Sequence, residues 1–115
     1  MSVIILGEYL GNKKVKLVHE QSGASFVTDA PLDNNGEGRL FSPTDLVGAA
    51  LGSCMLTVMG IVAERHNLDL GGMRVKIEKE MSQNPRRIGL LRADIYLPAH
   101  LSPAEREGLE KVAKS

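Results

Sequence analysis

Apolar and polar residues alternate in short runs at both ends of the chain, a pattern typical of half-buried strands. The first three runs, at residues 3–10, 14–19 and 25–28, are separated by short turn signals rich in polar residues and glycine. Two further runs, at residues 73–77 and 91–97, flank a turn that contains a proline. The pattern therefore predicts an N-terminal antiparallel β-meander and a separate β-hairpin.

Between these strands the alternation stops, and residues 46–63 form a run of eighteen without a charge. Ser42 is a good N-cap, Pro43 suits the first helical position, and Asp45 stands where a capping-box acid reaches back. This predicts a long central helix, apolar on every side, that must be covered all round. Its length reaches the lower limit for a membrane span. Because eight of the eighteen residues are small or hydroxylated, we favour a buried core helix.

The start signal of the central helix is repeated near the end of the chain, in the segment Ser102-Pro103-Ala104-Glu105. It predicts a second helix that runs to Ser115 without a stop signal, so we expect further residues to follow in the natural protein. The order of elements indicates an α+β fold with mainly antiparallel sheet. The length fits a single domain over residues 1–115.

Charge and composition narrow the partners and the compartment. The chain has 14 basic and 14 acidic residues and few aromatic ones, which argues against nucleic acid or an anionic membrane as partner. A single cysteine and an N-terminus without a signal peptide indicate a reducing compartment, and we expect the cytoplasm. The three histidines are isolated from one another and from the cysteine, so we expect no metal site.

Three glycines of the central helix, Gly48, Gly52 and Gly60, share a face because they lie four or eight residues apart. Such a face lets another backbone approach closely. It contacts either this chain's own sheet or C-terminal helix, or the same helix of a second subunit. We favour a homodimer, because a half-polar sheet and one short helix cannot surround the central helix.

Cys54, the only cysteine, lies near the middle of this helix, where we expect it to be buried. It is either a small structural hydrophobe or a reactive thiol for which Gly52 and Ser53 leave room. Cys54 lies twelve residues past the cap, about 18 Å along the axis. The helix dipole therefore cannot stabilise a thiolate there, because the effect fades within the first turn.

A reactive Cys54 thus needs a cation from elsewhere, and Arg39 is the best candidate by position. Arg39 ends a stretch, residues 29–39, that is dense in Pro, Gly, Asn and Asp and predicts an exposed loop. The loop is either a connector or part of the mouth of a site. Arg39 is either a solvated loop charge or the cation that reaches Cys54 of a second subunit.

The segment SPTDLVGAALGSC resembles the signature of the OsmC/Ohr family, the osmotically inducible and organic hydroperoxide resistance proteins. In that family a proline and an acid open the central helix, and a reactive cysteine follows eleven residues after the proline, as Cys54 follows Pro43. The resemblance implies an intertwined homodimer with two sites at the subunit interface. It also implies that Cys54 reduces organic hydroperoxides to alcohols, with a cation that holds the thiolate. In this chain we expect Arg39 and Asp45 as the supporting charges, an external dithiol as reductant and no cofactor.

Two features of the chain differ from the family pattern. Many members place Glu directly after the proline, whereas this chain has Thr44 there and its acid, Asp45, one residue later. The family's resolving cysteine, in a Cys-Pro segment after the penultimate helix, has no counterpart within these residues. The leading hypothesis is a thiol-dependent peroxidase. The alternatives are a non-catalytic dimer that binds a small apolar ligand and a structural dimer with an inert Cys54.

Overall fold

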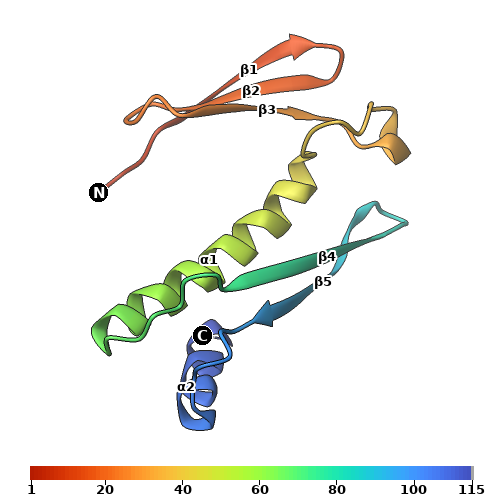
Figure 1. Cartoon of the computed structure of the whole chain (residues 1–115). Coiled ribbons are helices and arrows are strands. Elements are labelled where there is room, and N and C mark those ends of the chain that lie inside the picture. The colour runs from red at the N-terminus through yellow and green to blue at the C-terminus, as the bar shows by residue number, and fades with distance from the viewer. Residues whose placement is uncertain (115) are drawn as a thin grey trace. The chain divides into compact units, whose positions relative to one another are not determined.

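The structure is a computed structural model that describes residues 1–114. It has the predicted α+β fold, with antiparallel strands and two α-helices (Figure 1). The described residues form two compact units that divide after Leu46, and each unit is described by itself.

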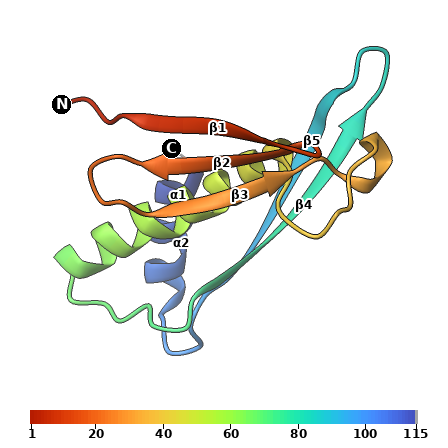
Figure 2. The ribbon, with the colours of Figure 1, turned by 90° about the horizontal axis from the view of Figure 1, so that it is seen from above.

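The first unit holds the predicted meander of three antiparallel strands, β1 (Ile5–Gly11), β2 (Lys14–His19) and β3 (Ser25–Asp29). The strands lie side by side in the order β1-β2-β3 (Figure 2). Asn12 and Lys13 both have positive φ, at 55° and 64°, as a tight hairpin turn between twisted strands requires. A short 3₁₀-helix, η1 (Leu32–Asn34), follows in the predicted loop.

The central helix, α1 (Pro43–Arg65), begins at the predicted capping box. The Asp45 amide donates to Ser42 Oγ at 3.0 Å, and the Ser42 amide donates to Asp45 Oδ2 at 2.9 Å. Two of the amides that a helix start leaves without partners are thereby satisfied. The prediction of a helix start at Ser42-Pro43 is confirmed.

The last helix, α2 (Pro103–Lys114), begins with the same arrangement. The Glu105 amide donates to Ser102 Oγ at 3.1 Å, and the Ser102 amide donates to Glu105 Oε1 at 2.8 Å. The hydrogen bond from the Ser102 backbone lowers the pKa of the Glu105 carboxyl below its ordinary value. The ionised carboxylate of Glu105 is therefore the stronger acceptor in this cap.

We expect the contribution of Glu105 to stability to depend on pH. Because the pKa is lower in the folded than in the unfolded chain, the contribution is present above the unfolded value and is lost as the pH falls through the folded value. The difference in urea midpoint between wild type and Glu105→Ala should therefore shrink from about pH 7 to about pH 3. Glu105→Gln, which can cap but cannot titrate, is the control, and a difference for Glu105→Ala that stays constant with pH would contradict the prediction.

The second unit contains the predicted hairpin, but with longer strands. β4 (Arg74–Ser82) pairs with β5 (Arg87–Tyr96) in antiparallel register. The extension past the predicted end of β4 includes Glu78, which lies opposite Arg92 and accepts a hydrogen bond from Arg92 Nη1. Cross-strand pairs of opposite charge stabilise such polar strand segments, and the alternation of apolar residues does not reveal them.

Gly48 and Gly52 let α1 approach the sheet of its own chain. A methyl group added at Gly48 would lie 3.2 Å from Ile77 Cγ2, and one added at Gly52 would lie 3.0 Å from Ile77 Cγ1 and 3.1 Å from Val75 Cγ1. The expectation that this face meets a second subunit is therefore wrong for these two glycines. Farther along α1, Met59 and Ala63 form the buried core with Leu101 and Leu109.

The two environments of the α1 glycines predict opposite effects on stability. Gly52→Val should destabilise the protein by about 1–3 kcal/mol, because the added carbons overlap β4. Gly60→Ala should stabilise it by up to about 1 kcal/mol, because a helix favours alanine and a methyl group there meets no described atom within 4 Å. Urea unfolding of both variants measures the difference. A neutral or stabilising Gly52→Val would contradict the observed packing.

Within the second unit α1 is covered on one side only. Of its most apolar eighteen-residue window, 22% is buried, so the expectation of a helix covered all round is not met by this unit. Within residues 1–114, α1 is the one helix long and apolar enough to cross a membrane by length and composition, which is weak evidence for a membrane helix.

Candidate functional site

Cys54 is a free thiol exposed to solvent on α1. The prediction that Cys54 is buried is therefore wrong for the single chain. Gly52 precedes it by two residues, which is about 200° around a helix, and Gly52 faces β4. Cys54 thus lies on the opposite side of α1, and the space left by Gly52 is not beside the sulfur.

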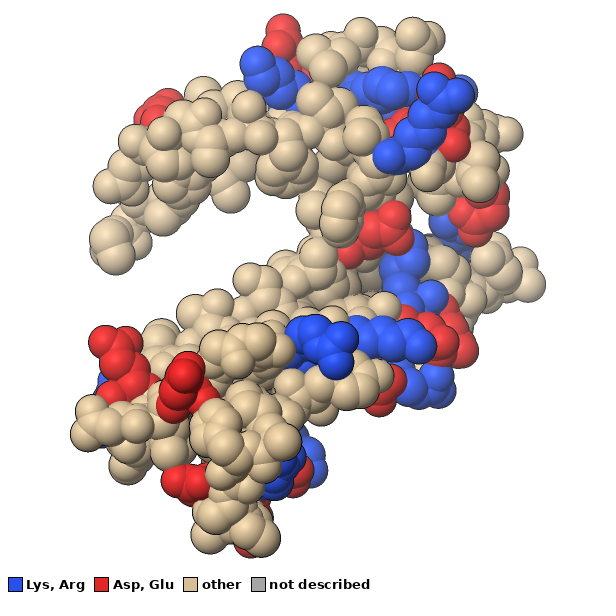
Figure 3. All heavy atoms as spheres, in the orientation of Figure 1, with Lys and Arg blue, Asp and Glu red and all other residues tan. Residues whose placement is uncertain are grey.

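The exposed side of α1 carries an apolar stripe with Cys54 at its centre. The stripe residues follow one another at spacings of four, three, four and three, which places them on one helical face: Val47, Leu51, Cys54, Val58 and Ile61. The aliphatic members are 36–50% exposed. No charged residue interrupts α1 between Asp45 and Glu64, and Figure 3 shows an uncharged surface along the middle of the helix.

Arg39 lies in the loop of the first unit, and its side chain is 83% exposed. Its Nε lies 3.8 Å from Glu37 Oε2, and Glu37 Oε1 lies 3.4 Å from Lys14 Nζ. The chain of charges continues to Asp29, whose Oδ1 lies 3.7 Å from Lys14 Nζ. Arg39 belongs to the first unit and Cys54 to the second, and the role of Arg39 toward the thiol stays a prediction.

Asp29 anchors this loop and was not singled out by the sequence pattern, which placed it at the start of an exposed loop. The residue ends β3 and is 1% exposed. Its Oδ2 accepts a hydrogen bond from the Glu37 amide at 3.2 Å, and its own amide donates to the Phe41 carbonyl at 3.1 Å. The buried carboxylate and the backbone amide of Asp29 together tie the two ends of the loop to each other. A Pro- and Gly-rich segment gives no signal of this, because such composition usually marks solvated connections.

Asp45 is engaged in the N-cap of α1. It precedes Cys54 by nine residues, about 13 Å along the helix axis, so the two side chains of one chain do not meet. Its role toward a thiol stays a prediction. Within residues 1–114, no group of three or more His, Cys, Asp or Glu side chains could hold a metal ion.

Comparison with known proteins identifies a family and solved structures that this chain resembles. A family model of OsmC-like proteins matches residues 36–115. The chain is similar to a solved structure from Psychrobacter arcticus 273-4, a protein named for osmotic stress induction and a detoxification response. The identity is 34%, the TM-score is 0.92, and the match covers 96% of this chain and 81% of that one. Comparison with curated proteins gives no match.

Two more distant structures share the fold. The organic hydroperoxide resistance protein OsmC of Legionella pneumophila is 18% identical, with a TM-score of 0.68 over 98% of this chain and 82% of that one. The organic hydroperoxide resistance protein OhrB of Bacillus subtilis is 13% identical, with a TM-score of 0.64 over 98% and 83%. With the family match over residues 36–115 and the Psychrobacter relative, these findings show that the chain belongs to the OsmC/Ohr family of OsmC-like proteins.

Proposed function

We propose that this protein is a homodimeric, thiol-dependent peroxidase that reduces organic hydroperoxides to alcohols. The observation that carries the proposal is the exposed Cys54 at the centre of the apolar α1 stripe. A structural cysteine is typically buried, whereas a reactive one is accessible. An apolar surface beside the sulfur suits the alkyl group of an organic hydroperoxide. Family membership supports the same chemistry, because two proteins of the same fold are named for hydroperoxide resistance.

The dimer follows from the α1 stripe. A contiguous exposed apolar patch on a small protein is typical of an interaction site, and spacings of four and three are those by which two helices pack along a seam. A second copy of α1 on this face would cover much of both stripes and place each sulfur in the seam, beside a gap that an organic hydroperoxide can enter. Strand β1 leaves further apolar residues exposed, with Ile5 at 65% and Tyr9 at 67%, which a second copy would also cover.

A thiolate at Cys54 needs a positive charge nearby. This charge must come from outside α1, because no charged residue of α1 lies within two turns of Cys54. In the proposed dimer, Arg39 of the partner subunit supplies it. A guanidinium stays charged at every physiological pH and offers several donors. It can therefore hold both the thiolate and the oxygen that becomes negative during the reaction.

The reaction transfers one oxygen atom. The Cys54 thiolate attacks the distal oxygen of the hydroperoxide, the O–O bond breaks, and an S–O bond forms. Sulfur is oxidised to sulfenic acid, and the peroxide is reduced to an alkoxide that takes up a proton and leaves as the alcohol. An external dithiol then reduces the sulfenic acid, which releases water and converts the dithiol to its disulfide. These steps need no bound cofactor, and we place them in the cytoplasm, where dithiols stay reduced.

The rate at which Cys54 is alkylated should report the activating cation. At about pH 7 the rate in Arg39→Ala should be about 10-fold or more below that of the wild type, because the thiolate loses its positive neighbour, while Arg65→Ala serves as a control at the far end of α1. Equal rates in wild type and Arg39→Ala would show that another group activates the thiol.

The proposed activity is tested by hydroperoxide consumption. Purified protein with excess dithiothreitol should consume cumene hydroperoxide catalytically and release an equal amount of the alcohol. Hydrogen peroxide should be a poorer substrate, because it has no alkyl group to bind the apolar stripe. Consumption at the rate of dithiothreitol alone would refute the peroxidase and leave a non-catalytic dimer that binds apolar ligands.

A further inference from the structure

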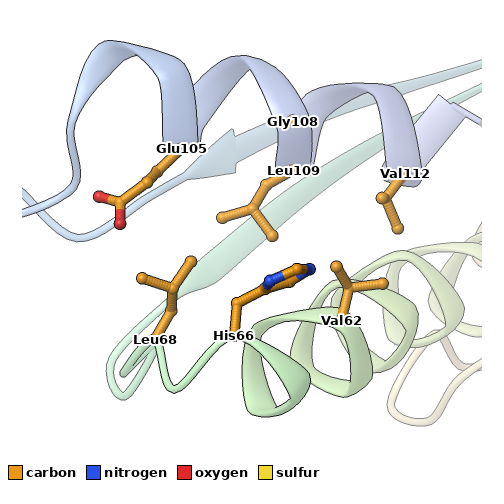
Figure 4. A pocket seen from close by; sticks show the side chains of 7 residues that line it. All are labelled: Val62, His66, Leu68, Glu105, Gly108, Leu109 and Val112. Atoms are coloured by element: carbon orange, nitrogen blue, oxygen red, sulfur yellow. The ribbon is translucent and has the colours of Figure 1, made fainter.

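The second unit contains a pocket between the C-terminal end of α1 and α2. Its volume is about 450 Å³. Figure 4 shows Leu109 and Val112 of α2 pointing toward the opposite wall, which carries Val62, His66 and Leu68. Val62 follows Cys54 by eight residues, about 12 Å along the axis of α1. The pocket is therefore separate from the thiol.

The walls of this pocket are apolar, and its polar groups are few. Among residues 1–114, the lining consists of aliphatic side chains, Gly108, His66 and Glu105. Pockets of about 300–1,000 Å³ with apolar walls and a few polar groups are typical small-molecule sites. This volume accommodates a small molecule.

Glu105 gives the pocket a negative rim. Its Oε1 accepts the capping hydrogen bond from the Ser102 amide at 2.8 Å, and that bond together with His100 favours the ionised carboxylate by lowering its pKa. A carboxylate has acceptor capacity on both oxygens, so Glu105 can cap α2 and still accept from a ligand. His66 is the other polar lining residue and can donate or accept one hydrogen bond.

We propose that this pocket binds a small apolar molecule with an ammonium group, of the alkylamine class. The hydrocarbon part would contact Val62, Leu109 and Val112, and the ammonium would lie at the Glu105 carboxylate. An anionic ligand of the same size is disfavoured, because it would place its charge beside Glu105. A neutral alcohol would keep the apolar contacts and lose the charge-assisted hydrogen bond.

Gly108 provides a way to fill the pocket without disturbing the fold. A methyl group added at Gly108 would meet no described atom within 4 Å, and any other residue is a better helix former except proline. A leucine side chain at this position would extend into the lined space. Gly108→Ala is the matched control, since it changes the helix propensity in the same direction but fills much less of the pocket.

Titration calorimetry with hexylamine, hexanol and hexanoate tests the proposal at about pH 7. Hexylamine should bind saturably, one per chain, at least about fivefold tighter than hexanol, and hexanoate should bind weakest. Gly108→Leu should abolish hexylamine binding, while Gly108→Ala keeps it within about threefold. Glu105→Gln, which retains a capping-box side chain, should remove the preference for the amine over the alcohol.

Three outcomes would overturn this proposal. They are an absence of saturable hexylamine binding, equal binding by Gly108→Leu with its circular dichroism unchanged, and tighter binding of hexanoate. The result is independent of the peroxidase proposal, because Cys54→Ser should bind hexylamine like the wild type. A protein without peroxidase activity could still bind the amine, and an active peroxidase could fail to bind it.

Discussion

Replacing Cys54 with serine should abolish the reduction of organic hydroperoxides, with a loss of at least about 1,000-fold. Serine is nearly the same size, but its hydroxyl is not ionised near neutral pH and cannot form a sulfenic acid. Because Cys54 is exposed, the substitution leaves the packing of the described chain unchanged. The measurement is the initial rate of cumene hydroperoxide consumption with excess dithiothreitol, at equal protein concentration.

The matched control is Ser53→Ala, which changes the neighbouring exposed residue and should keep activity within about threefold of wild type. Thermal unfolding of both variants should resemble that of the wild type, which separates lost chemistry from lost fold. Residual turnover by Cys54→Ser above the rate of dithiothreitol alone would show that the thiol does not carry the reaction.

A charge placed in the α1 stripe should convert the protein to a monomer. Val58 lies one turn from Cys54 in the stripe and is 36% exposed. In the proposed dimer, Val58→Asp would bury one carboxylate from each subunit at the interface. An uncompensated buried charge costs several kcal/mol. Sedimentation equilibrium should give twice the chain mass for wild type and close to 12.4 kDa for the variant.

The peroxidase activity of Val58→Asp should be about 100-fold or more below that of the wild type, because in a monomer Arg39 of the partner subunit would no longer reach Cys54. Ala104→Asp introduces the same charge on an exposed residue in the first turn of α2, where an acid is favourable. This control should remain dimeric and active. A monomeric wild type, or a dimeric Val58→Asp with full activity, would contradict the proposed assembly.

Local sequence signals predicted most of the secondary structure, because each depends on neighbouring residues. The serine caps at Ser42 and Ser102 are side-chain-to-backbone hydrogen bonds within three residues of each other. The bounds of β2 agree with the predicted residues 14–19. The additional length of β4 and β5 was missed, since pairs such as Glu78 and Arg92 become visible only when the strand register is known.

The environment of the candidate site could not be predicted in the same way. A helix with apolar residues on every side gives no preferred direction, so its sequence does not indicate which face meets the sheet. The glycine spacing fits both the chain's own sheet and a second subunit. We favoured the second subunit, whereas Gly48 and Gly52 face Ile77 of the same chain, and the expected burial of Cys54 is not seen. The sequence gives no signal of the pocket beside α2, because its residues come from separate segments that only the tertiary fold brings together.

The most direct measurement of the central chemistry is a single turnover without reductant. Reduced protein is mixed with one equivalent of cumene hydroperoxide in the presence of dimedone, which traps sulfenic acids, and is then digested and analysed by mass spectrometry. We expect one equivalent of cumyl alcohol and a dimedone adduct on the peptide that contains Cys54. An unmodified Cys54 with the hydroperoxide intact would contradict the peroxidase mechanism.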